Sequence, residues 1–264
     1  MHTNACSRAI ELATWRTNLA NDTVATPEFA RFVAADQAEH DWIDVAIQCP
    51  TRFEEGTLRS AQMQFLAQSS AQRHGRNYTA LTVTRLDDLK KNVLPGQTLA
   101  KLALAEDRAG FATEVLAGKR AVAQQINGAN GSNRLNALSD DHKQAASELM
   151  QLAGNTQDLR RKVYSVHELE AHPDSIVDPA TGLRANTVAV LEMNCARDEV
   201  AAVQKTITQH TAATQSGESD AQTEQQAQDR NDELCKLALL FATHAVTAFS
   251  LGYPGTDWAL FKNA

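Results

Sequence analysis

The stretch from Asn231 to Gly252 decides the fold, and it reads NDELCKLALLFATHAVTAFSLG. From Leu237 to Leu251 it contains no Asp, Glu, Lys or Arg. A helix of this composition is apolar on nearly every side, so it must be buried on nearly every side. Asn231 is a good N-cap, and Gly252 followed by Pro254 ends a helix. The apolar run is shorter than the roughly 20 residues that span a bilayer. It therefore predicts the central helix of a bundle, over Leu234–Leu251, and no membrane span.

The composition favours helices along the whole chain. Only 5% of the 264 residues are aromatic, and runs of the β-branched and aromatic residues that strands prefer are scarce. Alanine is frequent, has the best helix propensity and lets helices approach closely. A chain of this length buries enough surface to form a core without disulfides or metals. We therefore expect a single all-α domain over residues 1–264, built as a soluble multi-helix bundle.

Apolar residues at helical spacing predict further helices around the central one. The clearest pattern is an unbroken series at spacings of four and three, formed by Ala189, Met193, Ala196, Val200, Val203 and Ile207. The predicted helices cover about 6–20, 27–40 with a continuation to 46, 54–74, 97–126, 139–166 with a kink at Gly154, and 186–210.

Four segments between and after these helices have other compositions. Asn77–Thr84 is rich in β-branched and aromatic residues and predicts at most one short β element there. Turn formers at 127–133 mark a sub-boundary within the domain, and His172–Gly182 is expected to be loop. The polar, Gln-rich segment 211–222 predicts a mobile loop. The tail from Tyr253 still carries aromatic residues, so we expect it to dock on the body or on a partner.

The net charge of the chain restricts the kinds of molecule that it is expected to bind. The net charge of −7 gives an acidic surface that repels phosphate backbones, so we expect no nucleic-acid binding. The one basic cluster, Arg160–Lys162, is short and is typical of a solvated helix face.

The four cysteines, Cys6, Cys49, Cys195 and Cys235, are far apart in the sequence. They form no C-x-x-C pair, which argues against a zinc cluster and against a disulfide scaffold. A reducing compartment is the simpler interpretation. The first residues show no basic segment followed by an apolar one, so we expect a cytoplasmic protein, or one secreted without a Sec signal into a host cell.

Two groups of residues are similar to metal sites but have the wrong spacing. His167 and His172 are five apart, whereas the zinc-protease helix needs histidines four apart. Asp36, His40 and Asp44 lie on one helical stripe, but the chain contains no Glu-x-x-His of the kind that di-iron bundles use. We therefore expect no metal and no cofactor.

A cysteine nucleophile needs a histidine base, which can come from a distant segment. Cys49 and Cys195 are the candidate nucleophiles; the candidate bases are His74, His167, His172 and His210. Nothing in the sequence pairs them, so the catalytic residues, if any, are unknown. Gly110 to Gly118 has the wrong spacing for a phosphate loop.

A short stretch resembles the U-box of ubiquitin ligases. Ile176–Gly182 contains the pair Asp178-Pro179 and a glycine before a helix, as that family does. The Cys-Pro pair that is usual in the family is absent, and no residue roles are carried over.

The absence of enzyme motifs, together with long amphipathic helices, favours a non-enzymatic module for protein–protein interaction. Its partner would be another protein that contacts an exposed helix face or loop. Ala- and Gln-rich helical chains without a Sec signal are also common among virulence effectors that bacteria inject into host cells. Two alternatives stay open: an effector enzyme that modifies host proteins, either cysteine-dependent or ubiquitin-ligase-like, and a virion structural component. The sequence leaves the oligomeric state undetermined.

Overall fold

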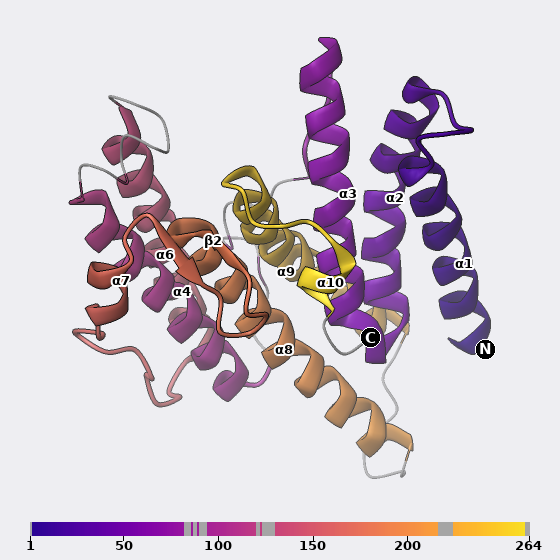
Figure 1. Cartoon of the computed structure of the whole chain (residues 1–264). Coiled ribbons are helices and arrows are strands. Elements are labelled where there is room, and N and C mark those ends of the chain that lie inside the picture. The colour runs from indigo at the N-terminus through magenta and orange to yellow at the C-terminus, as the bar shows by residue number, and fades with distance from the viewer. Residues whose placement is uncertain are drawn as a thin grey trace. The chain divides into compact units, whose positions relative to one another are not determined.

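The computed structural model describes residues 2–81, 86, 89, 94–119, 122, 130–215 and 224–261, with only the backbone at 2–4, 210–215 and 224. Within these residues the chain is all-α, as predicted, and its helices are accompanied by one two-stranded sheet (Figure 1). The chain divides into two compact units. The first unit comprises Met1–Val83 and Val203–Val246, and the second comprises Thr84–Ala202 and Thr247–Ala264.

The first unit begins with three helices that follow one another side by side (Figure 1). They are α1 (His2–Asn21), α2 (Glu28–Gln48) and α3 (Phe53–His74), and the short 3-10 helix η1 (Pro50–Arg52) connects the last two. Small residues fill the α1–α2 contact, where Ala13, Ala35 and Ala38 are fully buried. The low aromatic content thus has a packing consequence, because alanine seams bring helix backbones close together.

The second half of α8 (Thr187–Gln215) and most of α9 (Glu224–Ser250) complete the first unit. Phe53 at the start of α3 meets Phe241 of α9 edge to face, with ring centroids 6.4 Å apart. Gln204 of α8 accepts the backbone N–H of Glu54 and donates to the carbonyl oxygen of Pro50. The connection between α2 and α3 is therefore held by both later helices.

The central helix predicted over Leu234–Leu251 is α9, and its burial confirms the prediction. No residue from Glu233 to Phe249 is exposed, and Leu237, Phe241 and Ala245 are fully buried. Among the described helices, α9 alone is long and apolar enough to cross a membrane by length and composition, over Gln225–Ser250. Core helices pass the same test, and 61% of its most apolar window is buried.

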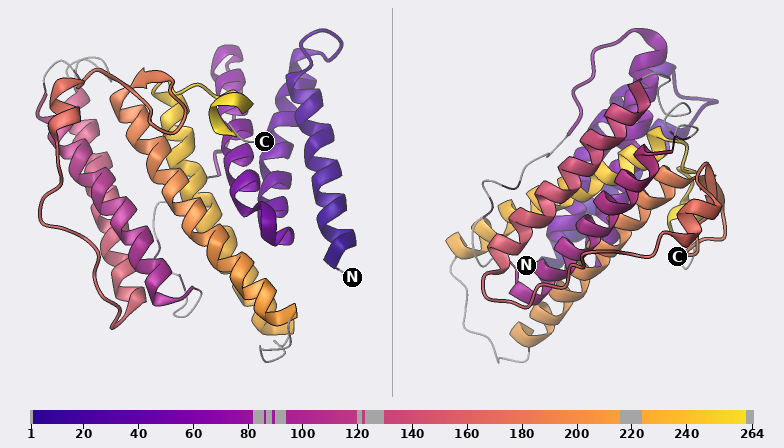
Figure 2. Two further views of the ribbon diagram at one scale, coloured as in Figure 1. Left: turned by 60° about the horizontal axis from the view of Figure 1, so that its bottom comes forward. Right: turned by 90° about the vertical axis from the view of Figure 1, so that its left-hand side faces the viewer.

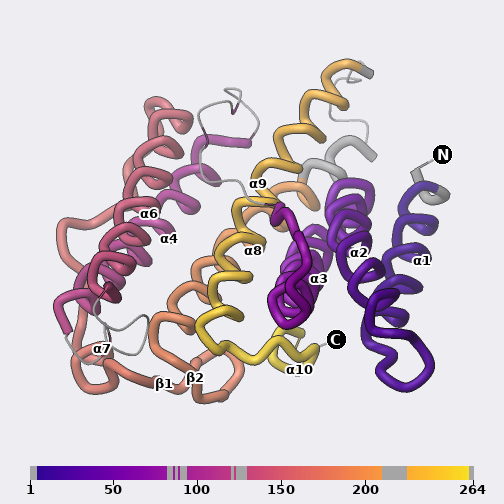
Figure 3. The backbone as a smooth tube through the Cα atoms, turned by 90° about the horizontal axis from the view of Figure 1, so that it is seen from above, coloured from indigo at the N-terminus to yellow at the C-terminus, as the bar shows by residue number. Residues whose placement is uncertain are grey.

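The second unit is built on α4 (Gly96–Ala117) and α6 (Gly131–Ala153), which lie alongside each other (Figure 2). The first half of α8 belongs to it. Between α6 and α8 the chain forms the short helix α7 (His167–Ala171) and an antiparallel hairpin (Figure 3). The hairpin pairs β1 (Ser175–Val177) with β2 (Arg184–Asn186).

The C-terminal segment docks on the second unit, so the prediction of a docked tail is confirmed. Arg197 of α8 donates to the carboxylate of Asp178, to Tyr253 Oη and to the carbonyl oxygen of Ala259. Tyr253 Oη also donates to Asp178. These contacts attach α10 (Asp257–Leu260) to the hairpin and to α8.

Several predicted boundaries were wrong. The helix predicted over 139–166 begins earlier, at Gly131, and ends at Ala153, because Gly154 takes a left-handed φ of 62° that stops it. The helix predicted over 97–126 ends at Ala117. Where at most one short β element was predicted, at 77–84, Asn77–Leu81 forms no strand, and 82–84 lie outside the described residues. Of the sheet, β1 lies in the segment predicted as loop, and β2 follows that segment.

The predicted domain organisation is only partly covered by the described residues. Of the sub-boundary at 127–133, residues 127–129 lie outside the described part of the chain, Asn130 is the N-cap of α6, and residues 131–133 begin that helix. Of the loop at 211–222, residues 211–215 end α8, and the rest lie outside the described part. The single domain over residues 1–264 stays a prediction.

Candidate metal centre

His142 is a core residue of α6. The buried seam of this helix runs through Leu135, Ser139, His142, Ala146 and Leu149, at spacings of four and three. An imidazole therefore occupies a position where the helical pattern would place an apolar side chain, and its exposed fraction is 1%. Ser139, one turn earlier, donates its hydroxyl to the carbonyl oxygen of Gly110 at 2.8 Å and so fixes α6 against α4.

Two carboxylates hold the His142 ring from opposite sides. Its Nδ1 lies 2.5 Å from Glu106 Oε2 on α4, and its Nε2 lies 2.9 Å from Glu192 Oε1 on α8. All three side chains are fully buried. Burial lowers the pKa of His142, but the negative charges of Glu192 and Glu106 outweigh it and raise this pKa well above its ordinary value. The ring therefore carries both protons and donates to both carboxylates.

Cys195 brings a thiol to the same place. It packs against Ala105 and Ala109, whose small side chains let α8 lie close to α4 beside Glu106. A carboxylate oxygen of Glu106, a ring nitrogen of His142 and the sulfur of Cys195 all lie within 4.8 Å of one another. Burial raises the pKa of the Cys195 thiol, and nearby carboxylates, with Glu199 first among them, raise it further.

The donor set suits a borderline transition-metal ion. Zn²⁺ takes thiolate, imidazole and carboxylate ligands at about 2.0–2.3 Å, whereas Mg²⁺ and Ca²⁺ take oxygen ligands almost exclusively. Tetrahedral bonds of that length put donor atoms roughly 3.3–3.8 Å apart, so a group within 4.8 Å needs only small side-chain movements to close on an ion. The negative charges of Glu106 and Glu192 raise the pKa of His142 and so favour a positive charge at this place, whereas the raised pKa of Cys195 comes first from burial.

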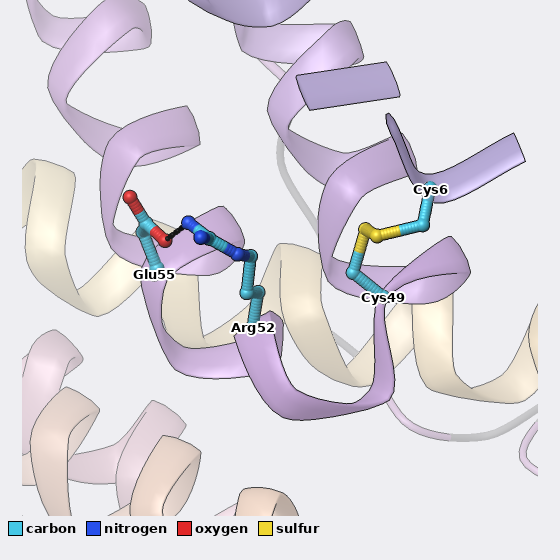
Figure 4. The surroundings of a disulfide bond; sticks show 4 residues. All are labelled: Cys6, Cys49, Arg52 and Glu55. Carbon is cyan, nitrogen blue, oxygen red and sulfur yellow. Dashed lines mark hydrogen bonds and ion pairs between the residues drawn. A yellow bond between two sulfur atoms is a disulfide. The ribbon is translucent and has the colours of Figure 1, made fainter. Parts of the chain in front are cut away.

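The expectation that the cysteines are not joined by disulfides was wrong for one pair. Cys6 and Cys49 form a disulfide, with Cα atoms 5.1 Å apart (Figure 4). Cys6 lies near the start of α1 and Cys49 directly after α2, so the antiparallel helix pair brings together two cysteines that are 43 residues apart in the sequence. Beside them, Arg52 and Glu55 form an ion pair at 2.5 Å. Sequence spacing cannot reveal such a pairing.

Among the histidines proposed as bases, those whose side chains are described are exposed and are not grouped with a candidate nucleophile. His74 is exposed and lies 3.2 Å from Glu28, and His167 is 85% exposed beside Glu168. His172 is exposed after α7, and the side chain of His210 lies outside the described residues. Within the second unit, the structure places His142 beside Cys195, a histidine that the sequence did not single out.

The remaining sequence motifs are structural or solvated. His40 and Asp44 are exposed on α2, where the buried acids are instead Glu39 and Asp41. Asp178, in the stretch that resembles a U-box, sits in the turn of the β-hairpin and forms an ion pair with Arg197 at 2.8 Å.

Each residue of the candidate centre left only a weak signal in the sequence. Glu106 lies beside the predicted seam of α4, and His142 lies within the seam of α6. Glu192, Cys195 and Glu199 repeat at spacings of three and four along α8, one position before the apolar series. Two features could have indicated the site: a histidine within the buried seam of α6, and a row of acidic residues next to the apolar series of α8. The sequence does not show, however, that these helices pack together with α4.

Comparison with known proteins adds no assignment. No protein-family model, curated protein or solved structure matches the chain.

Proposed function

We propose that the second unit binds one divalent transition-metal ion, with Zn²⁺ the best fit, between Glu106, His142 and Cys195. The observation that carries this proposal is the convergence of oxygen, nitrogen and sulfur donors from three helices inside the protein. The expectation of no metal site rested on local spacings, which cannot register donors contributed by separate helices.

The metal ion would replace the protons on one ring nitrogen of His142 and on the sulfur of Cys195. Metal binding requires an imidazole nitrogen without its proton and a thiolate, so it releases protons from the site. Nδ1 of His142 is the nitrogen that faces Glu106, which makes it the ligand atom. Nε2 would keep its hydrogen bond to Glu192. A carboxylate on the far nitrogen of a metal-bound histidine commonly fixes the orientation of the ring.

A cysteine nucleophile fits the same residues less well. Cys195 does lie beside a histidine and a carboxylate, as such an enzyme requires. A reactive cysteine, however, has a lowered pKa and is accessible, whereas the pKa of Cys195 is raised and the side chain is buried. A bound cation would stabilise the thiolate without any need for access by a substrate.

The test is metal binding by the full-length protein. After chelation and dialysis, the protein is titrated with Zn²⁺ and with Co²⁺, and bound metal is measured by elemental analysis. We expect about one ion per chain and, with Co²⁺, a sulfur-to-metal charge-transfer band. Cys195→Ser should remove the band and weaken binding by at least about a hundredfold. Glu192→Gln should weaken binding by about 10–100-fold and keep the band.

Cys235→Ser is the matched control, because Cys235 is the other free cysteine and lies in the first unit. Its stoichiometry and absorption should equal those of the wild type, and circular dichroism should show all variants folded. If the wild type binds no more metal than Cys195→Ser does, the proposal fails and the three buried residues are a structural ion network.

A protein-interaction role has one observation of its own. Leu12 and Trp15 are one turn apart on α1, with 40% and 57% of their surface exposed. We propose this apolar face of α1 as the surface that contacts another protein. A photo-crosslinking residue at position 15 should yield a discrete crosslinked species with a host-cell protein, and the same residue at the exposed Trp258 of the second unit should not. Equal yields at both positions would contradict this role.

The disulfide supports a place of action outside the reducing cytoplasm. Disulfides persist in oxidising compartments, such as the periplasm or the exterior of cells. We propose that the chain works in such a compartment, where Cys6–Cys49 stays oxidised while the buried Cys195 remains a thiol.

A further inference from the structure

The first unit contains a pocket of about 400 Å³. It lies where α1 ends, α2 begins and α3 ends, which is the opposite end of the α1–α2 pair from the disulfide. Its lining combines an apolar part with polar and charged side chains. The apolar part is formed by Ala20, Phe32 and Leu66, and the polar part by Asn21, Thr23, Glu28, Arg31, Ser70, Arg73 and His74.

The acidic residue of the lining is already neutralised. Glu28 forms an ion pair with Arg76 at 2.5 Å, accepts the hydroxyl of Ser70 at 2.5 Å and lies 3.2 Å from His74. The hydrogen bonds from Arg76 and Ser70 lower the pKa of Glu28 to about 2. This carboxylate therefore stays charged and keeps its partners. Asp22, nearby, is bound to the backbone N–H groups of the turn that follows α1.

Among the described residues, two guanidinium groups of the lining have no carboxylate within ion-pair distance, although the charge of Asp22 acts on Arg31. Arg31 on α2 and Arg73 on α3 form no ion pair and no side-chain hydrogen bond within the described part of the chain. The Nε of Arg31 is buried and lacks an acceptor. A buried donor without an acceptor is costly, and a ligand oxygen can supply the missing acceptor. Arginine forks match the two oxygens of a carboxylate or phosphate.

The apolar part of the lining favours a ligand that has an apolar body as well as a charged group. Phe32 faces the pocket and carries the Arg76 guanidinium 5.5 Å from its ring centroid, which fixes the aromatic wall. Small-ligand sites commonly combine such apolar walls with a few polar groups that orient the head of the ligand. We propose that this pocket binds a small organic anion, whose carboxylate or phosphate head is held by Arg31 and Arg73 and whose apolar body lies against Phe32 and Leu66.

Calorimetry with the full-length protein tests the proposal through four probes: benzoate, phenyl phosphate, benzyl alcohol and inorganic phosphate. We expect saturable binding of at least one aromatic anion, and the preference between the first two identifies the head group. Benzyl alcohol lacks the charge and inorganic phosphate lacks the body, so each should bind at least about tenfold more weakly.

Arg31→Met and Arg73→Met keep the length of the side chain and remove its charge. Each should weaken binding of the preferred anion by about tenfold or more. Arg134→Met, at an exposed arginine of α6 in the second unit, should leave binding unchanged. Equal binding by wild type and by Arg31→Met, equal binding of benzyl alcohol, or no saturable binding of either aromatic anion would overturn the proposal. If inorganic phosphate binds as tightly as phenyl phosphate, the apolar wall has no role and the proposal is equally overturned.

Discussion

Glu39 is a buried carboxyl group whose surroundings favour the protonated form. It is fully buried in α2, and Tyr78 Oη donates to its Oε2 at 2.7 Å. Burial, together with the charge of Asp36, raises the pKa of Glu39 to about 8, although the hydrogen bond from Tyr78 acts in the opposite direction. The nearest histidine nitrogen, His40 Nε2, lies 3.9 Å from Oε1 and is mostly exposed.

This raised pKa predicts that stability depends on pH. Between about pH 4.5 and pH 8 the unfolded carboxyl loses its proton while the folded one keeps it, so the folded state binds more protons. Stability is therefore greatest below pH 4.5 for this group and falls as the pH rises towards 8, by on the order of a few kcal/mol. Glu39→Gln should flatten the dependence, as measured by urea unfolding at pH 5, 6.5 and 8.

The comparison of the two pH profiles isolates Glu39, because His40 is present in both proteins. The fluorescence of Trp15 and Trp42 reports on the first unit once Trp258 is replaced by Phe. Parallel profiles for Glu39→Gln and its parent would show that Glu39 is ionised in the folded protein.

At the same scale, candidate residues could be identified from the sequence, but the side chains that surround them could not. His142 and Cys195 are both single polar residues among apolar ones, and in a sequence such residues are hard to distinguish from satisfied core positions. Their significance depends on Glu106 and on the distance of 4.8 Å or less that links the donors, which is a property of three packed helices. The sequence could supply candidates such as Cys195, but it could not supply the partner.

At the scale of elements, the contact between α2 and α3 depends on Gly56. A Cβ at this position would lie 2.5 Å from the backbone nitrogen of Ala46 and 2.6 Å from the carbonyl oxygen of Trp42. Both neighbours are backbone atoms, so the helices themselves would have to move apart. We expect Gly56→Ala to destabilise the first unit by at least about 2 kcal/mol, even though alanine is the better helix former.

Urea unfolding followed by Trp42 fluorescence in the Trp258→Phe background measures this loss. Gly118→Ala is the control in the second unit, followed there by Trp258 fluorescence, because a Cβ at Gly118 would meet its nearest neighbour at 3.4 Å, an ordinary contact. A loss for Gly56→Ala no larger than that for the control would mean that α2 and α3 lie further apart.

The existence of the helices was predictable, and some of their ends were not. Seams such as Ala189–Ile207 repeat over many turns, and all six residues of that series are buried as expected. A helix end depends on a few residues and their dihedral angles. Gly154 was interpreted as a kink, yet its left-handed φ of 62° ends α6. The short pairing of β1 with β2 was missed because three-residue strands carry no periodicity.

At the scale of the whole chain, the disulfide is the feature that the sequence least revealed. Cys6 and Cys49 are joined across 43 residues of sequence. The closing of a loop of this length restricts the unfolded chain, and the chain-entropy estimate for the stabilisation is about 4 kcal/mol, usually an upper bound. Because both cysteines belong to the first unit, we expect reduction to destabilise that unit.

Two measurements on protein prepared under oxidising conditions check this expectation. Thiol titration in denaturant should find two thiols before reduction and four after it. Dithiothreitol should lower the free energy of unfolding of the first unit by about 2–4 kcal/mol in the Trp258→Phe background. The double variant Cys6→Ser/Cys49→Ser should show the same loss and no further response to the reductant, whereas Cys235→Ser should respond like its parent. Four thiols before reduction would contradict the disulfide, and with it the argument for an oxidising compartment.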